Sequence, residues 1–377
     1  MKGKQGMVCM GLLLVLSSCH TGKQITASGL QRKDFQTEVN GQHTDLFTLS
    51  NKQGMEVCIT NYGARVVSIL VPDRNGKRED VVCGFSTITE YMEQRQNFGS
   101  TVGRYIGRIL NARFTLDGVE YKLVPNNGKS GHISHGGNPG FADRIWKVEQ
   151  ADTHRACLSY LSPDGENGFP GNLKVTLVYS LGEDDNALDL TYEATTDAPT
   201  VLNLSHHSFF NISGNFTKSV EDQQLWVDAD RFTPYDDKKC VTGEYLQVAG
   251  TPLDFRMPHA IGECIDADHP QLKVVNGYDH TWELNTKGDD TRPAAWVYDP
   301  ASGRKMEIFT TEPGMQIYTG NGLKGKMTGK RGIAYPFRSA VCFETMHFQD
   351  SPNQPGFPST VLRPGEVFRS HTVYKFE

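Results

Sequence analysis

Apolar residues in this chain of 377 residues come in short runs that end at turn-forming sequences. Residues 174–181 (KVTLVYSL) and 188–194 (LDLTYEA) alternate between apolar and polar, and the stretch GEDDN between them is typical of a turn. Sustained helical spacing is nearly absent, and the 38 glycines and 18 prolines fit many short strands better than long helices. The pattern predicts an all-β fold, a large antiparallel β-sandwich, with a turn or two of helix near residues 86–94 (STITEYMEQ).

The N-terminus is typical of a bacterial lipoprotein signal. Lys2 and Lys4 precede a short apolar run that ends in LSSC at Cys19. This run is about half of the ~20 residues that a membrane-spanning helix needs. His20 rather than an aspartate follows the cysteine, so we expect the protein in the cell envelope, at the outer membrane. An ordinary signal peptide cut nearby is the alternative. The expected organisation is a signal peptide (1–18), a lipidated Cys19 with a polar tether (19–33) and one domain (34–377).

Charge and cysteine spacing argue against several other classes of function. The formal net charge of -6 is too mildly acidic to attract nucleic acid or an anionic membrane surface. No glycine-rich loop stands between a strand and a helix, so nothing predicts nucleotide binding. The cysteines beyond Cys19 lack the spacing of a zinc site, and we expect buried free thiols, with one or two disulfides as the alternative. These cysteines are Cys58, Cys83, Cys157, Cys240, Cys264 and Cys342.

Two adjacent histidines stand in the stretch LNLSHHSFFN, residues 202–211. Neighbouring side chains of a strand point to opposite faces, so we expect only one of the two in a functional site. His206 shares its face with two leucines, which is typical of a core. His207 shares the other face with Asn203 and Phe209, and this mixture suits a sugar-sized pocket. This alternation (parity) therefore predicts that His207 is the functional histidine. The alternative is a structural histidine that is hydrogen-bonded to a backbone carbonyl.

Three further residues are candidates for the same chemistry. His135 precedes two glycines, where the backbone could approach a ligand closely. Asp254 lies in the turn-rich stretch TPLDFR. Glu344 is a carboxylate in the otherwise apolar strand VCFETM, and such a group is either paired or has a raised pKa. The alternatives are a salt bridge for Glu344 and a capping or turn role for Asp254.

Several multi-residue motifs follow one another from about Phe47 to the C-terminus. They include HGGNPGFADRIW, NLSHHSFFN, GTPLDFR, GYDHTWEL, TTEPGMQIYTGN and FETMHFQDSPNQPGF. Their content and order resemble those of the aldose 1-epimerases, also called galactose mutarotases. The resemblance implies a large β-sandwich and interconversion of the α and β anomers of free aldohexoses such as glucose and galactose.

The resemblance also implies roles for single residues. His207 aligns with the family's general acid, in agreement with parity, Glu344 with its catalytic base, and His135 with a third catalytic position. Gly107 stands where the family has asparagine, and His206 where many members have asparagine, so the fine substrate preference and the role of His206 stay open. The aligned substrate-binding residues are Arg108, Asp254 and Gln316.

The implied mechanism is ring opening by paired proton transfers. Glu344 takes the proton of the C1 hydroxyl while a protonated His207 delivers one to the ring oxygen. We expect apolar neighbours to raise the pKa of Glu344, and this carboxylate to raise the pKa of His207. The chemistry requires no cofactor and no metal ion. A structural calcium ion stays open, although no ligand loop for it is recognisable.

Three alternative functions stay open from the sequence. A hexose-phosphate epimerase on the same fold would need several basic groups around the phosphate. A non-catalytic surface sugar-binding lipoprotein would need no matched acid and base. A glycoside hydrolase would need two carboxylates, for which Asp254 and Glu344 are candidates. We expect a monomer that binds a free aldohexose, contacts the membrane only through lipid and binds no nucleic acid.

Overall fold

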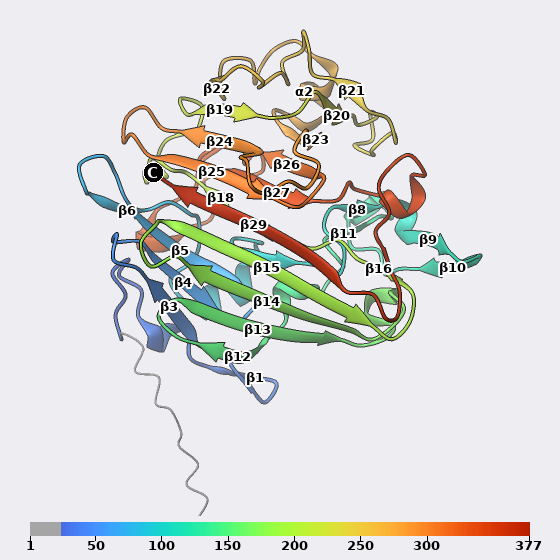
Figure 1. Ribbon diagram of the computed structural model, residues 1–377, viewed down its shortest axis with the longest axis horizontal. Helices are drawn as coiled ribbons and strands as arrows, with labels where there is room; N and C mark the ends of the chain where they lie inside the picture. Colours follow the sequence, from blue (N-terminus) through green and yellow to red (C-terminus); the bar gives the residue numbers. More distant parts are fainter. Residues whose placement is uncertain (1–23) are drawn as a thin grey trace, which may run out of the picture.

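The computed structural model describes residues 24–377, and antiparallel strands dominate it (Figure 1). Sheets of nine, six and four strands contain most of the strands of the described chain, which confirms the predicted all-β fold. The expected helix is also present, because α1 spans Ile88–Gln94 and begins at a capping box between Thr87 and Glu90. A second helix, α2 (Pro270–Val275), was not predicted; a proline in its first turn and a cap from His269 start it.

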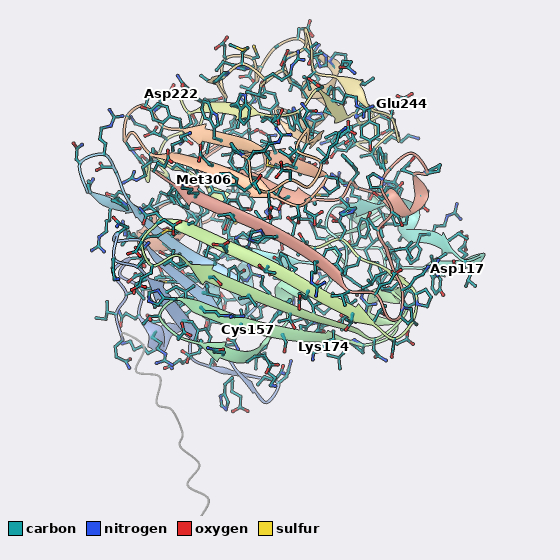
Figure 2. All side chains as sticks on the ribbon, viewed as in Figure 1. Asp117, Cys157, Lys174, Asp222, Glu244 and Met306 are labelled. Atoms are coloured by element: carbon teal, nitrogen blue, oxygen red, sulfur yellow. The ribbon has the colours of Figure 1, made fainter. Side chains whose placement is uncertain are left out.

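The nine-stranded sheet contains the alternating residues that the sequence predicts as strands. Its strands β14 and β15 pair along their whole length, and buried residues alternate with more exposed ones in both. On this sheet Lys174 is exposed, whereas Met306 is buried (Figure 2). In spatial order the strands are β12 (Lys147–Ala151), β13 (Arg155–Ser162), β14 (Leu173–Leu181), β15 (Ala187–Thr196), β29 (Phe368–Phe376), β25 (Lys305–Thr310), β24 (Ala295–Tyr298), β19 (Gln224–Val227) and β22 (His259–Ala260).

The six-stranded and four-stranded sheets share one apolar core with the nine-stranded sheet. Leu177 of the nine-stranded sheet, Phe343 of the six-stranded sheet and Ile59 of the four-stranded sheet belong to a single buried cluster. The six-stranded sheet runs β18 (Phe209–Phe210), β27 (Val341–Met346), β26 (Gly314–Tyr318), β23 (Asp279–Glu283), β20 (Arg231–Thr233) and β21 (Leu246–Gln247). The four-stranded sheet runs β3 (Leu46–Ser50), β4 (Glu56–Thr60), β5 (Arg65–Pro72) and β6 (Arg78–Asp80).

The remaining strands form short two-stranded pairs. The hairpin of β9 and β10 projects from the edge of the molecule and turns at Asp117 (Figures 1 and 2). The pairs are β1 (Glu38–Val39) with β2 (Gln42–His43), β9 (Arg113–Leu116) with β10 (Val119–Lys122), β8 (Arg108–Ile109) with β11 (Ile133–Ser134), β7 (Ser100–Val102) with β17 (Ser205–His207), and β16 (Thr200–Val201) with β28 (Val361–Leu362).

The segment expected to be a tether lies partly within the described residues. Residues 24–33 pack against the domain: Leu30 is buried, the backbone N–H of Ser28 donates to Glu56, and Arg32 pairs with Asp45. The packed structure therefore begins before residue 34. The signal peptide, Cys19 and residues 20–23 lie outside the described residues. Neither α1 nor α2 has the length and apolar character that a membrane crossing requires.

The cysteines of the described residues are free thiols, which confirms the expectation of unpaired cysteines over that of disulfides. Four of them are buried, whereas Cys157 and Cys264 are partly exposed.

Candidate active site

A cavity of about 260 Å³ opens beside β27, where the six-stranded sheet meets β17 and β8. Its volume lies just below the roughly 300–1,000 Å³ of pockets for drug-sized ligands, so it suits a ligand of monosaccharide size.

Five of the six predicted catalytic and binding residues line this cavity. The lining residues are Gln96, Asn97, Gly107, Arg108, Ser134, His135, His207, Phe209, Asp279, Gln316, Tyr318, Glu344, Met346 and Gln349.

Glu344 and His207 face each other in this cavity. Glu344 lies in β27, and its Oε1 is 3.5 Å from Nε2 of His207. His207 comes from β17, and its ring stacks on Phe209 with centroids 5.0 Å apart. The exposed fractions of the two residues are 4% and 6%. The sheet therefore holds a carboxylate and an imidazole side by side, largely shielded from water.

Burial determines the protonation of both groups. It raises the pKa of Glu344 well above its ordinary value, and the nearby Asp279 raises it further. Burial also lowers the pKa of His207 well below its ordinary value, and His135 adds to the decrease. The expected increase for Glu344 is confirmed. The expected increase for His207 is wrong, because burial disfavours the charged imidazolium and neighbouring His135 disfavours it further.

The second histidine of the pair belongs to the core, as parity predicts. His206 is 3% exposed, and its Nε2 lies 2.7 Å from Oγ of Ser208. The rings of Tyr179 and Tyr374 lie against it on the side away from the cavity. Burial lowers the pKa of His206 to about 3, so it is neutral.

His135 lies at the cavity wall in a left-handed conformation, with φ of 53°. Its ring centroid is 5.5 Å from that of His207, and its Nδ1 accepts a hydrogen bond from the backbone of Gly107. Burial and the charge of Arg108 lower its pKa to about 4. The following glycines serve a different purpose from the expected one. A Cβ on Gly136 would lie 2.0 Å from the carbonyl oxygen of Gly103, so this residue allows two backbone segments to approach, not backbone and ligand.

Asp254 lies away from the cavity, and this is a correction of the sequence interpretation. It does not line the cavity, and its carboxylate binds the guanidinium of Arg256, which lowers its pKa. Asp279 supplies the acidic side chain of the cavity instead. The sequence gives only a weak signal for Asp279, which opens the strand DHTWE two residues after Gly277.

Cross-strand register aligns the polar groups of the cavity. Thr281, Gln316 and Glu344 stand opposite one another on β23, β26 and β27, so they share one face of the sheet. Gln316 donates from Nε2 to Asp279 at 2.6 Å and accepts from Thr281 at 2.5 Å. Burial raises the pKa of Asp279, although Arg108 and Gln316 oppose the shift. The network fixes which way the amide of Gln316 faces.

Most of the folded region matches one family. Residues 45–375 match the family model described as aldose 1-epimerase. The chain belongs to the aldose 1-epimerase family. It is 40% identical over 331 residues to a galactose mutarotase of Bos taurus, covering 88% of this chain and 93% of that protein. It is 36% identical over 340 residues to an aldose 1-epimerase of Escherichia coli K12, covering 89% and 96%.

The similarity extends to solved structures of the family. A GalM/aldose epimerase homologue from C. elegans superposes with a TM-score of 0.81 at 30% identity, covering 89% of this chain and 99% of that chain. A galactose 1-epimerase from Lactobacillus acidophilus gives a TM-score of 0.78 at 28% identity, with 90% and 96% covered. The enzyme is therefore an isomerase with the fold of this family.

The glycine at position 107, where the resemblance implies an asparagine, lies against another side chain. Gly107 has φ of 75°, and a Cβ there would lie 2.5 Å from Cγ of Gln349. Gln349 was not predicted, and its side chain fills this space. Its Nε2 donates to the hydroxyl of Tyr235 at 2.7 Å, and its Oε1 accepts from the backbone N–H of Arg108 at 3.3 Å. An amide group therefore lines this part of the cavity, although it comes from another segment.

Proposed function

We propose that Glu344 and His207 interconvert the α and β anomers of a free aldohexose by opening and closing its ring. The single observation that supports these roles is the 3.5 Å separation of a carboxylate and an imidazole that line the same sugar-sized cavity. Glu344 accepts the proton of the C1 hydroxyl, and His207 donates a proton to the ring oxygen as the bond between C1 and that oxygen breaks. Rotation about C1–C2 presents the other face of the aldehyde, and the reverse transfers close the opposite anomer.

One proton shared by the pair is sufficient for this cycle. The raised pKa of Glu344 and the lowered pKa of His207 both favour a resting pair of a carboxylic acid beside a neutral imidazole. The reactive arrangement, carboxylate and imidazolium, has the same number of protons. It forms when the proton moves from Oε1 to Nε2. Each positioned proton transfer contributes typically about 10²–10⁴-fold to the rate. The proposed reaction requires no cofactor.

Four side chains around the pair are proposed to hold the sugar. Asp279, Gln316 and Gln349 offer carboxylate and amide groups to hydroxyls, and Arg108 offers a guanidinium. His135, which is neutral at neutral pH because its pKa is about 4, stands beside His207. Because its Nδ1 accepts from the backbone of Gly107, its Nε2 carries the hydrogen and donates near the ring oxygen. Polar groups of this kind fix orientation in a small pocket.

A phosphorylated hexose is a poorer candidate for the substrate. Among the described residues that line the cavity, Arg108 is the one permanent cation, and two carboxylates share the same wall. A phosphate would require several basic groups. The names of the relatives, galactose mutarotase and aldose 1-epimerase, support a free sugar. The glycosidase pair suggested by the sequence loses support, since Asp254 lies outside the cavity.

Polarimetry on freshly dissolved sugars tests the proposal. We expect the enzyme to accelerate mutarotation of α-glucose and α-galactose and to leave their 6-phosphates near the uncatalysed rate. Acceleration of the phosphates alone would favour the hexose-phosphate epimerase. Release of reducing sugar from an oligosaccharide would favour a hydrolase.

We further propose that the protein is a lipoprotein of the cell envelope, anchored at the outer membrane through Cys19. Support comes from the sequence alone: two lysines, a short apolar run and LSSC. Cys19→Ala should move the protein to the soluble fraction or leave the signal peptide attached. A processed Cys19→Ala protein that still fractionates with membranes would overturn this proposal.

A further inference from the structure

A third chemically reactive side chain lies directly beside the catalytic pair. Cys342 precedes Glu344 by two residues on β27, so both side chains point to the same face of the strand. One ligand atom each from His207, Cys342 and Glu344 lies within 4.8 Å of the others. Cys342 itself is fully buried and is not part of the cavity lining. The proposed proton transfers do not use it.

We propose that His207, Cys342 and Glu344 bind a soft divalent cation, for which Zn²⁺ is the reference ion, and that the bound ion inhibits the enzyme. Nitrogen, sulfur and oxygen ligands are those that Zn²⁺ takes in proteins. Bonds of about 2.0–2.3 Å in a tetrahedral site put the ligand atoms roughly 3.3–3.8 Å from one another. The observed 3.5 Å between His207 and Glu344 already matches this spacing, and Cys342, whose sulfur would stand about 3.6 Å from the other two ligand atoms, must approach by about 1.2 Å at most.

The surroundings favour binding at this position. For Glu344, the ion pair recorded among the described residues is the one with His207, so no arginine or lysine there competes with a cation. Three protein ligands leave the fourth position of the ion open towards the cavity. The thiol proton of Cys342 and the proton shared by the pair leave as Zn²⁺ enters. Thiolate, carboxylate and Zn²⁺ together carry no net charge, which is the favourable outcome at a buried site.

Ligand type also sets which ions bind. A thiolate selects Zn²⁺, Cd²⁺ or Co²⁺ over Mg²⁺ and Ca²⁺, which prefer oxygen ligands. The inhibition rests on the proposed function, because the ion would occupy both the acid and the base. The binding itself does not depend on that function, and the two parts are tested separately.

Cobalt spectroscopy on the full chain tests the binding. We expect one equivalent of Co²⁺ to give thiolate-to-cobalt charge transfer in the near ultraviolet. Cys342→Ser and Cys342→Ala should lose this band, and Cys240→Ser should keep it. Cys240 is the matched control because its Sγ lies 3.3 Å from Nε2 of His132, the other thiol–imidazole contact of the described residues. A band that survives in both Cys342 variants, or is absent from the wild type, would overturn the proposal.

Inhibition is measured by polarimetry in parallel. Zn²⁺ should slow mutarotation reversibly, a chelator should restore it, and higher sugar concentration should raise the Zn²⁺ concentration required. Cys342→Ser should turn over normally in chelator and need at least about tenfold more Zn²⁺ for the same inhibition. Equal sensitivity of Cys342→Ser and wild type, or loss of activity in chelator, would contradict the inhibitory role. If the wild type does not mutarotate any sugar, the proposed function fails while the cobalt result stands by itself.

Discussion

The two sides of the cavity are built from different kinds of structure. The reactive side consists of His207 and Glu344, which lie within hydrogen-bonded strands of the sheets. The recognition side is mixed. Arg108, Asp279 and Gln316 lie in strands, whereas Gly107, His135 and Gln349 lie in connecting segments, and Gly107 and His135 have positive φ. The comparison indicates that strands hold the reactive pair and part of the recognition side, whereas the rest of the fit to a particular sugar depends on loops, which generally vary more than strands do.

The largest effect expected on the reactive side is that of Glu344→Gln. The amide keeps the shape of the side chain but cannot accept the proton of the C1 hydroxyl. We expect kcat to fall at least about 10²-fold with little change in sugar binding, because the recognition side is intact. Polarimetry gives kcat, and equilibrium binding gives affinity. Near-normal turnover by the folded variant would remove the role of base from Glu344 and leave Asp279 as the remaining carboxylate of the cavity.

The paired histidines test whether the two faces of β17 are correctly assigned. His207→Asn removes the proton donor to the ring oxygen and should cost at least about 10²-fold in kcat. His206→Asn is the matched control, because His206 packs between tyrosines away from the cavity. Its effect should fall on stability more than on kcat, as measured by thermal unfolding. Equal kcat losses in the two folded variants would show that the division between a reactive face and a core face is wrong.

On the recognition side, Asp279 should matter far more than Asp254. Asp279→Asn removes a charge-assisted hydrogen bond to the sugar, worth about 10- to 100-fold in kcat/KM. Asp254→Asn serves as the control, since Arg256 binds this carboxylate outside the cavity. Initial rates at low sugar measure both. A larger loss for Asp254→Asn would restore the interpretation based on the TPLDFR stretch.

Substitutions at Gly107 and at Gln349, which fills the space beside it, should alter the affinity for the sugar by a smaller amount. Gln349→Ala loses about one hydrogen bond to the sugar and should raise KM about 3- to 10-fold with little change in kcat. Gly107→Asn alone should be worse, because its Cβ meets Gln349 at 2.5 Å. Asparagine tolerates the positive φ at this position, so combining the two changes should recover part of the loss. If the losses of the two single variants simply add up in the double variant, Gln349 does not take the place of an asparagine side chain at position 107.

The smallest effect concerns pH. The pKa of His207 is well below its ordinary value of 6.5, so the pair keeps its single proton when the pH falls from 7.5 to 6.5. With chelator present, kcat/KM should fall by less than about twofold over this range. A histidine with the ordinary pKa would be half protonated at pH 6.5, and the pair would then lose about twofold in kcat/KM. Activity declines at lower pH, when His207 takes up a second proton for the pair, and at higher pH, when Glu344 loses the last one. NMR of the imidazole should find His207 neutral at pH 6.5; an imidazolium there would contradict the assignment.

The sequence by itself determined the strand architecture, because alternation of period two in β14 and β15 leaves few other folds. Parity also separated His207 from His206, since the two faces of a strand are a local property of the chain. Glu344 was recognisable as a carboxylate in an apolar strand.

Tertiary structure alone decided the remaining features of the site. Gln349 and Gly107 lie far apart in the sequence, and their contact depends on how distant loops meet. Asp279 rather than Asp254 reaches the cavity because the register of β23 with β26 sets it beside Gln316. Cys342, His207 and Glu344 come together from two strands, which no cysteine spacing could indicate. The direction of the pKa shift of His207 was also decided there, because burial depends on all surrounding segments and disfavours the charged imidazolium.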